Sequence, residues 1–317
     1  MNIITVAIPV YNSKAEHLER LFLSLSNQTL KEFEILICND GSTNKETLEF
    51  LSKIESNITL INSETNKGIY ETRNILIKEC KTKYISFVDS DDLIPNDYLE
   101  KLYEPISGKS GIMTFCWFER FIDDIEYDFK EKDNVIYTDN LIDLAVTGKF
   151  GHSIWGRIFE TAVLKKWEIT REKGFDDSQL VPVIASSVNK VIKVNNTVYY
   201  YRITENSIMN LNHDPLLQAY RTYKFYLDYF QPISKKSEIY LDVMINLTLL
   251  KLYAISNKSS YTKKDIVNCK KILRKHIFKL RKAGINFNLR LQIFFILLSF
   301  RCFRKKYLKK RSGAIKV

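Results

Sequence analysis

The sequence predicts an α/β fold in which helices flank a mostly parallel sheet, followed by a helical C-terminal extension. In the first part of the chain, short apolar runs alternate with segments of helical spacing, which is typical of parallel strands joined by right-handed crossovers. Each apolar run ends in Asn, Asp, Gly or Ser, so polar side chains should gather at one edge of the sheet. The C-terminal part instead shows only helical spacing and a large excess of basic residues.

Four apolar runs in the first part of the chain predict strands, because they are short, rich in Ile, Val and Phe, and bounded by turn residues. They span residues 3–8, 33–38, 58–61 and 84–88. The segments between them place apolar residues three and four positions apart and therefore predict helices over residues 15–28, 45–55 and 69–80.

The fourth predicted strand ends in a group of carboxylates, Asp89, Asp91 and Asp92, around Ser90. One aspartate there would serve as a helix N-cap. Three carboxylates within four positions repel one another and need a partner. Oxygen ligands at close spacing suit Mg²⁺ or Mn²⁺, and a cation so placed can stabilise a departing diphosphate. This pattern predicts a divalent-cation site.

Polar segments follow all four strands in order: Ile8-Pro9-Val10-Tyr11-Asn12, Asn39-Asp40-Gly41-Ser42, Asn66-Lys67-Gly68 with Arg73-Asn74, and Asp89-Ser90-Asp91-Asp92. Each segment alone is typical of a turn, but the ordered set resembles the family 2 glycosyltransferases. These enzymes have the Rossmann-like GT-A fold and transfer a sugar from a nucleotide-sugar with inversion at the anomeric carbon. The resemblance is dense over residues 1–105 and looser to about residue 210. It implies a catalytic domain over 1–212, with a nucleotide-binding half (1–105) and an acceptor half (106–212), followed by a basic helical domain over 213–317.

The resemblance implies a nucleotide-sugar site built from the ends of the first three strands. Pro9, Tyr11 and Asn12 would form the floor under the base and ribose, with the Tyr11 ring available for stacking. Asp40 would accept a hydrogen bond from the uracil N3–H, a pairing that discriminates between bases. Asn66 and Gly68 would line the same site, where Gly68 allows the backbone to approach the nucleotide closely.

The same resemblance implies roles around the diphosphate. Asp91 would be the principal metal ligand, and Asp89, beside Ser90, would contact the ribose or the metal. Arg73 would lie near the phosphates or, alternatively, pair with one of the aspartates. His152 and His213 are weaker candidates for a third metal ligand, because no two histidines have metal-ligand spacing.

An inverting transfer needs a base for the acceptor hydroxyl, and the segment Gly174–Leu180 offers Asp176 and Asp177. Family members commonly carry Glu-Asp at this point, so Asp176 departs from the pattern, whereas Asp177 matches it. We expect Asp177 to be the general base, with a pKa raised by its neighbour and by partial burial. Either aspartate would also suit a helix N-terminus, and capping can coexist with catalysis.

The segment around Trp155 resembles a Trp-X-Lys-Leu stretch of the family, with Arg157 in place of the usual Lys. Trp155 would stack on a sugar face or simply pack in the core, and Arg157 would hold a phosphate or the base carboxylate. Further on, Val198–Arg202 resembles the strand that closes the catalytic domain. Arg202 or the following loop would reach the diphosphate, whereas the alternating tyrosines are expected to pack at the sheet edge.

Composition favours a folded cytoplasmic enzyme. Apolar residues make up 45% of the chain, and the five cysteines are scattered, which favours reduced thiols. The first residues lack the pattern of a secretory signal peptide.

Charge is very unevenly distributed along the chain. Residues 257–317 contain nineteen Lys or Arg and one acidic residue, Asp265, so the net charge there is +18 against +11 for the whole chain. Helices are predicted at 214–230, 236–256, 263–283 and 288–310. The apolar run 291–300 is too short for the ~20 residues needed to span a bilayer. Beside so many cations it suggests a helix at the cytoplasmic membrane surface; burial among the tail helices and a dimer interface are the alternatives.

The resemblance, together with these observations, implies an inverting, metal-dependent glycosyltransferase of hexosyl or N-acetylhexosaminyl type. The donor would be a UDP-sugar, and the acceptor a glycan or lipid-linked glycan in the synthesis of a capsule or other surface polysaccharide. A nucleotidyltransferase is one alternative, but it usually has a Gly-rich basic loop where this chain has Pro9–Asn12. A non-catalytic scaffold that binds a membrane or nucleic acid is the other. Nucleic acid is not the expected partner, because the positive charge is confined to the tail, and the oligomeric state is left open.

Overall fold

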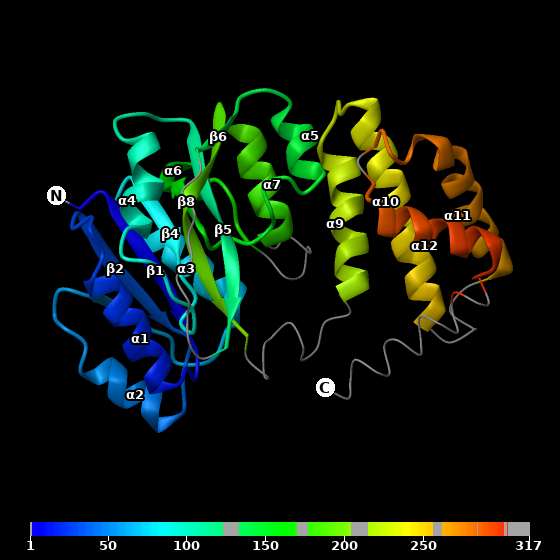
Figure 1. Cartoon of the computed structure of the whole chain (residues 1–317). Helices are drawn as coiled ribbons and strands as arrows, with labels where there is room; N and C mark the ends of the chain where they lie inside the picture. The colour runs from blue at the N-terminus through cyan, green and yellow to red at the C-terminus, as the bar shows by residue number, and fades with distance from the viewer. Residues whose placement is uncertain are drawn as a thin grey trace. The chain divides into compact units, whose positions relative to one another are not determined.

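The computed structural model describes residues 2–122, 133–169, 177–203, 215–255, 262–283, 285–300 and 303 (Figure 1). The chain forms two compact units. The first contains Met1–Leu141 and Phe150–Ser207, and the second contains Ile142–Lys149 and Ile208–Val317. Asp176, His213 and the basic residues after Phe303 lie outside the described residues.

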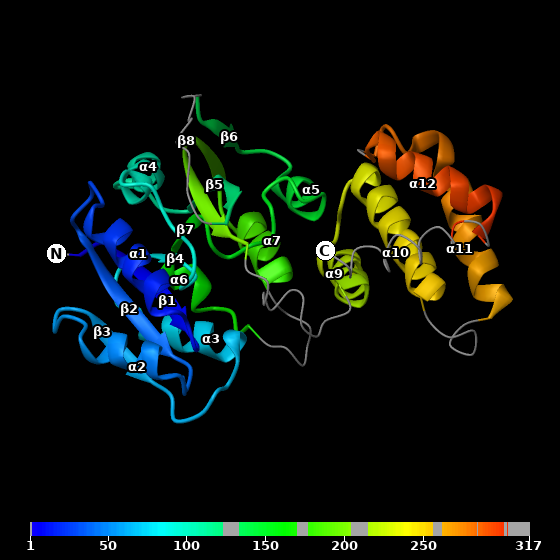
Figure 2. The same ribbon diagram turned by 60° about the horizontal axis from the view of Figure 1, so that its bottom comes forward.

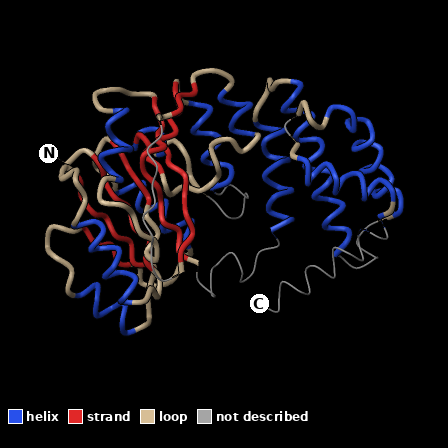
Figure 3. The backbone as a smooth tube through the Cα atoms, in the orientation of Figure 1, coloured by secondary structure: helices blue, strands red, loops and turns tan. Residues whose placement is uncertain are grey.

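The first unit is built on an eight-stranded sheet, shown in red in Figure 3. In spatial order its strands are β3 (Thr59–Asn62), β2 (Phe33–Asn39), β1 (Ile4–Val10), β4 (Tyr84–Phe87), β7 (Arg157–Glu160), β5 (Ile112–Phe121), β8 (Lys190–Arg202) and β6 (Val135–Tyr137). The first four are parallel, as predicted, because each returns through a crossover helix. β7 runs antiparallel to both neighbours, so the sheet is mixed beyond β4.

The crossover helices begin and end close to the predicted residues: α1 (Ala15–Ser26), α2 (Lys45–Ser52) and α3 (Ile69–Glu79). Alternate residues of β1, from Ile4 to Val10, pack with the buried face of α1 and with α4 (Tyr98–Tyr103) in one apolar core. The intervening β1 residues face the other side of the sheet, where α3 packs. A short 3-10 turn, η1 (Glu104–Ile106), leads to β5.

The later part of the first unit adds the strand pair β5–β8, which is parallel and shifts its register between Cys116 and Trp117. The short helix α6 (Thr161–Leu164) follows β7, and α7 (Asp177–Ser187) precedes β8. Residues of β5, β7 and β8, among them Ile112, Ile158 and Tyr199, belong to the same core as β1. The sheet and its core therefore continue across residue 105.

The second unit is helical (Figure 2). It consists of most of α5 (Leu141–Val146) together with α9 (Pro215–Tyr229), α10 (Lys235–Ile255), α11 (Lys263–His276), a 3-10 turn η3 (Ile277–Lys279) and α12 (Phe287–Leu298). A separate apolar core joins α10, α11 and α12. The backbone N–H of Ser234 donates to Asp143 Oδ1 at 3.1 Å, which ties α5 to this unit.

The predicted tail helices are present, with shorter ends. The predicted helix 263–283 ends as α-helix at His276. α12 ends at Leu298, and most of the remainder of the predicted helix 288–310 lies outside the described residues. Over the described ranges, no helix combines the length and apolarity needed to cross a bilayer.

Candidate active site

The loops after β1 and β2 are locked together by Asn12, which adopts a left-handed backbone (φ 48°). Its Oδ1 accepts hydrogen bonds from the backbone N–H groups of Thr43 (2.8 Å) and Asn44 (3.0 Å). Its own N–H donates to Ser42 Oγ at 2.9 Å. Pro9 is buried in β1, whereas the Tyr11 ring is 48% exposed beside this clamp. Asn12 therefore holds the loops after β1 and β2 together, and the Tyr11 ring beside them is accessible to a stacking partner.

Asp40 secures the loop that leads into α3. Its Oδ1 accepts from the N–H of Lys67 at 2.7 Å and its Oδ2 from the N–H of Gly68 at 2.9 Å. Gly41 has a φ of +65°, and a Cβ there would lie 2.5 Å from the carbonyl carbon of Thr65. Gly68 also has positive φ (+89°), but a Cβ there would meet open space. Asn66, in the same loop, is exposed.

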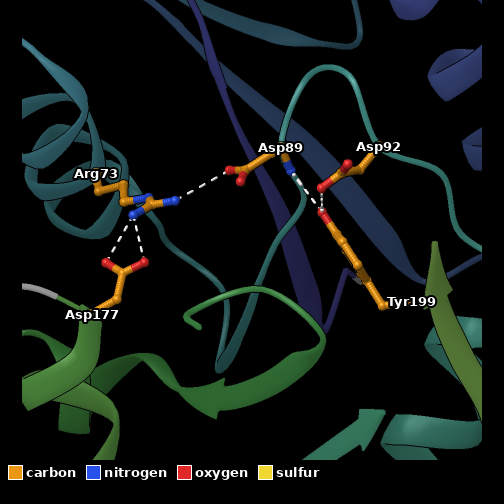
Figure 4. A network of polar contacts seen from close by, with 5 residues as sticks. All are labelled: Arg73, Asp89, Asp92, Asp177 and Tyr199. Atoms are coloured by element: carbon orange, nitrogen blue, oxygen red, sulfur yellow. Dashed lines mark hydrogen bonds and ion pairs between the residues drawn. The ribbon is translucent and has the colours of Figure 1, made fainter. Parts of the chain in front are cut away.

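Arg73 lies on α3 and joins two carboxylates from distant parts of the chain (Figure 4). Its Nη1 donates to both carboxylate oxygens of Asp177, at 2.8 and 2.7 Å, and its Nη2 donates to Asp89 Oδ1 at 3.2 Å. Burial disfavours the charged guanidinium, but Asp177 and Asp89 outweigh this effect and raise the pKa of Arg73. Of the two alternatives stated above, the structure shows the pairing with aspartates.

The three carboxylates after β4 have different surroundings. Asp89 pairs with Arg73, yet burial, together with nearby Asp177, still raises its pKa. Asp92 is fully buried and accepts hydrogen bonds from Tyr199 Oη (2.6 Å) and from the N–H of Arg202 (2.8 Å). Burial and then the charge of Asp89 raise the pKa of Asp91 to about 6. The hydrogen bonds of Asp92 are thus made within the fold, and burial together with Asp89 and Asp91 raises the pKa of Asp92 well above its ordinary value.

Tyr199 is the site residue that the sequence reasoning missed (Figure 4). Its hydroxyl donates to Asp92 and accepts from the backbone N–H of Asp89 at 3.1 Å, so it fixes both ends of the carboxylate loop. The expectation that these tyrosines pack at a sheet edge was wrong for Tyr199, which is fully buried in the core. The only signal in the sequence was a polar aromatic residue in a strand otherwise suited to the core.

Three further residues predicted for the site, Trp155, Arg157 and Arg202, make packing contacts or hydrogen bonds to the backbone. Trp155 stacks on Tyr199 (ring centroids 4.6 Å apart) and on Tyr201 (5.4 Å), so its packing role is visible. Arg157 is buried, donates to the carbonyl oxygens of Ser153 and Phe150, and lies over the Phe115 ring. Arg202 likewise bonds to backbone oxygens, those of Asp91 and Ile122.

One further contact links two loops at this edge. Ser90 Oγ lies 2.7 Å from Ser13 Oγ, which connects the carboxylate loop to the loop after β1. Asp177 is the first residue of α7, so the predicted base does sit at a helix N-terminus.

The resemblance to family 2 glycosyltransferases implies a divalent cation, and the carboxylate loop is the place where such an ion would bind. Among the described residues, no group of three or more His, Cys, Asp or Glu side chains is arranged as a metal site. Within the same residues, no side-chain hydrogen bond or ion pair joins Asp91 to another residue. Mg²⁺ is usually held by one or two carboxylates together with substrate phosphates. Asp91 and its neighbour Asp89 fit that kind of donor set.

Comparison with known proteins agrees with this architecture. The family model for glycosyl transferase family 2 matches residues 5–166, and the chain belongs to this family. Glycosyltransferase GlyA of Streptococcus pneumoniae serotype 4 is 30% identical over 223 residues, covering 65% of this chain and 31% of that protein. The chain therefore spans about a third of the length of GlyA. Glycosyltransferase GlyG of the same organism is 25% identical over 235 residues, covering 67% and 74%.

Among solved structures, residues 1–349 of Staphylococcus aureus TarS in complex with UDP-GlcNAc are similar with a TM-score of 0.63. The two chains are 20% identical, and the match covers 98% of this chain and 92% of that one. This likeness confirms the predicted GT-A fold with its helical C-terminal part.

Proposed function

We propose that this protein is an inverting glycosyltransferase that moves a sugar from a UDP-sugar to a glycan or lipid-linked glycan during surface polysaccharide synthesis. The observation that carries the proposal is the bridge made by Arg73 between Asp89, on the donor side, and Asp177. The Arg73 guanidinium thus pairs with both the carboxylate predicted to lie near the diphosphate and the predicted base, at the carboxyl edge of the sheet. Membership of the family and the UDP-GlcNAc bound to TarS support the choice of donor.

On the donor side, Asp91 and Asp89 would hold a Mg²⁺ or Mn²⁺ ion, which when bound neutralises charge on the diphosphate leaving group. Tyr199 holds the loop that carries both carboxylates. The half-exposed Tyr11 ring offers a stacking face for the base, and Asn12 and Asp40 keep the surrounding loops in place. Asn66, Gly68, Ser90, Trp155 and Arg157 remain the predicted lining of this site.

On the acceptor side, Asp177 takes the proton of the attacking hydroxyl. The hydroxyl oxygen then forms a bond to the anomeric carbon while the bond from that carbon to the diphosphate oxygen breaks, with inversion. Arg73 binds both oxygens of Asp177 and so fixes the direction in which the carboxylate presents its free lone pairs. Asp176, where the family usually has Glu, remains the second predicted carboxylate of this side.

The finer parts of the proposal are a hexosyl or N-acetylhexosaminyl donor, a capsule-type polysaccharide product, and a peripheral position at the inner face of the cell membrane. A nucleotidyltransferase is less well supported, because the loop after β1 is closed by the Asn12 hydrogen bonds instead of forming a Gly-rich phosphate cradle.

The test is binding and hydrolysis of a panel of nucleotide-sugars, with Mn²⁺ and with chelator, by the wild type, Asp91→Ala and the control Glu49→Gln. Glu49 lies on α2, where it makes an exposed ion pair with Lys45. Metal-dependent hydrolysis of one UDP-sugar that is lost only in Asp91→Ala supports the proposal. A folded wild type that binds no nucleotide-sugar would refute it.

A further inference from the structure

Helix α12 has two opposite apolar faces. Ile293 and Ile296 are fully buried and, with Leu289 and Leu297, pack into the core of the helical unit. The opposite face is exposed: Phe287 is 64% exposed, Phe294 51%, Phe295 55% and Leu298 67%. Burial within the helical unit therefore accounts for only half of this apolar helix.

The exposed residues form one stripe along the helix. Counted from Phe287, they stand at positions i, i+4, i+7, i+8 and i+11, with Leu291 as the second member. Such spacing places side chains on a single face of a 3.6-residue helix. A soluble helix normally carries polar residues on its outward face, and an aromatic stripe there marks a contact surface.

The charge near the stripe in the sequence is predominantly positive. Between Thr262 and Phe300 the chain has ten Lys or Arg and one acidic residue, Asp265, which lies on α11. Arg281 and Lys282 are exposed just before α12. Arg290 places its guanidinium 5.6 Å from the centre of the Phe287 ring. Aromatic side chains flanked by cations suit an interface that is apolar inside and negatively charged at its surface.

We propose that the exposed face of α12 (Phe287, Leu291, Phe294, Phe295 and Leu298) binds an anionic lipid bilayer. The helix lies along the membrane surface, since its twelve residues would extend only about 18 Å against a hydrocarbon core of about 30 Å. The stripe enters the acyl boundary while Arg281, Lys282 and Arg290 contact lipid headgroups. The membrane contact itself does not depend on the proposed function. Only its purpose does, which is to hold the enzyme near a lipid-linked acceptor.

The experiment is co-sedimentation of the full chain with vesicles, without donor or acceptor. Vesicles of phosphatidylcholine alone are compared with vesicles containing phosphatidylglycerol. The test variant is Phe294→Gln/Phe295→Gln, and the matched control is Val267→Gln, an exposed apolar residue on α11 outside the stripe (60% exposed). Circular dichroism establishes that each variant is folded, and light scattering gives the mass of each protein in solution.

We expect the wild type and Val267→Gln to bind anionic vesicles equally, and the double variant to bind roughly tenfold or more weakly. Binding to phosphatidylcholine alone should be weaker, since the cations then lack a partner. Equal binding by the double variant would overturn the proposal, because basic charge alone would then suffice. Absence of vesicle binding would also overturn it, and a dimer that the double variant abolishes would identify a second copy as the occupant. Because no donor is present, failure here is distinguishable from failure of the proposed activity.

Discussion

Arg73 and Asp177 are 104 positions apart in the chain, and the guanidinium Nη1 of Arg73 lies within hydrogen-bonding distance of both oxygens of the Asp177 carboxylate. Arg73 belongs to the crossover helix after β3, and Asp177 begins the helix before β8. The ion pair is well shielded, since the two side chains are 7% and 21% exposed. It therefore holds α7 and the predicted base in one position relative to the carboxylate loop.

Replacing Arg73 should reduce both stability and turnover. In Arg73→Gln, Asp177 and Asp89 would lose their shared cation, and an uncompensated buried charge costs about 3–5 kcal/mol. We expect a lower melting temperature and a fall in kcat of about a hundredfold from the misplaced base. Arg73→Lys should recover part of the stability but not the contact with both oxygens. Chemical denaturation and steady-state kinetics measure the two effects, and wild-type kcat in folded Arg73→Gln would contradict the role given to this ion pair.

Asp177→Asn separates the proposed base from its structural role. The amide oxygen still accepts a hydrogen bond from Arg73, so the fold should persist, whereas the proton can no longer be taken up. We expect kcat for transfer to fall about 10²–10⁴-fold while donor binding changes little. The rate of sugar transfer and the dissociation constant of the donor should both be measured for the wild type and the variant. If transfer persisted at the wild-type rate, another group would have to be the base.

Tyr199→Phe removes one hydroxyl and leaves the ring stacked on Trp155. The N–H of Asp89 and the carboxylate of Asp92 would each lose a partner in a buried place. We expect a loss of about 1–3 kcal/mol in unfolding free energy and a weaker apparent affinity for Mn²⁺ in donor hydrolysis. Tyr201→Phe is the control, since its ring also stacks on Trp155. An unchanged metal affinity would restrict Tyr199 to a role in the core.

Two glycines offer a matched pair for the loop clamp at the donor side. Gly41→Ala should be the more damaging, because its Cβ would lie 2.5 Å from backbone at Thr65 in addition to the strain of positive φ. Gly68→Ala carries the strain alone, about 1–3 kcal/mol for a residue in a sparsely populated backbone region. Thermal unfolding of both variants gives the order. A Gly68→Ala protein that is stable but has lost UDP-sugar binding would also support a close approach of the nucleotide there.

The strands and helices of the nucleotide-binding half could be predicted from the sequence because their signals are local. A strand is indicated by a short apolar run such as Ile4–Val10, and a turn by neighbouring residues such as Asp40 and Gly41. Both patterns can be recognised within a few positions. The antiparallel pairing of β7 with β4 and the pairing of Arg73 with Asp177 could not be predicted in the same way, since they depend on contacts between residues 74–104 positions apart. Tyr199 was missed because its role depends on one hydroxyl, which bonds to Asp89 and Asp92. The neighbouring tyrosines of β8 look the same in the sequence, which therefore does not single out Tyr199.

The course of β7 also limits how this protein could be rebuilt by exchanging parts with relatives. β7 hydrogen-bonds β4 on one side and β5 on the other, and Ile158 lies in the core that β1 and α1 begin. A chimera joined at residue 105 would place a foreign surface against that strand and would separate Asp92 from its own Tyr199. The proposed donor specificity should therefore be exchanged either with the whole first unit or one loop at a time at the carboxyl edge, and not with the segment before residue 105.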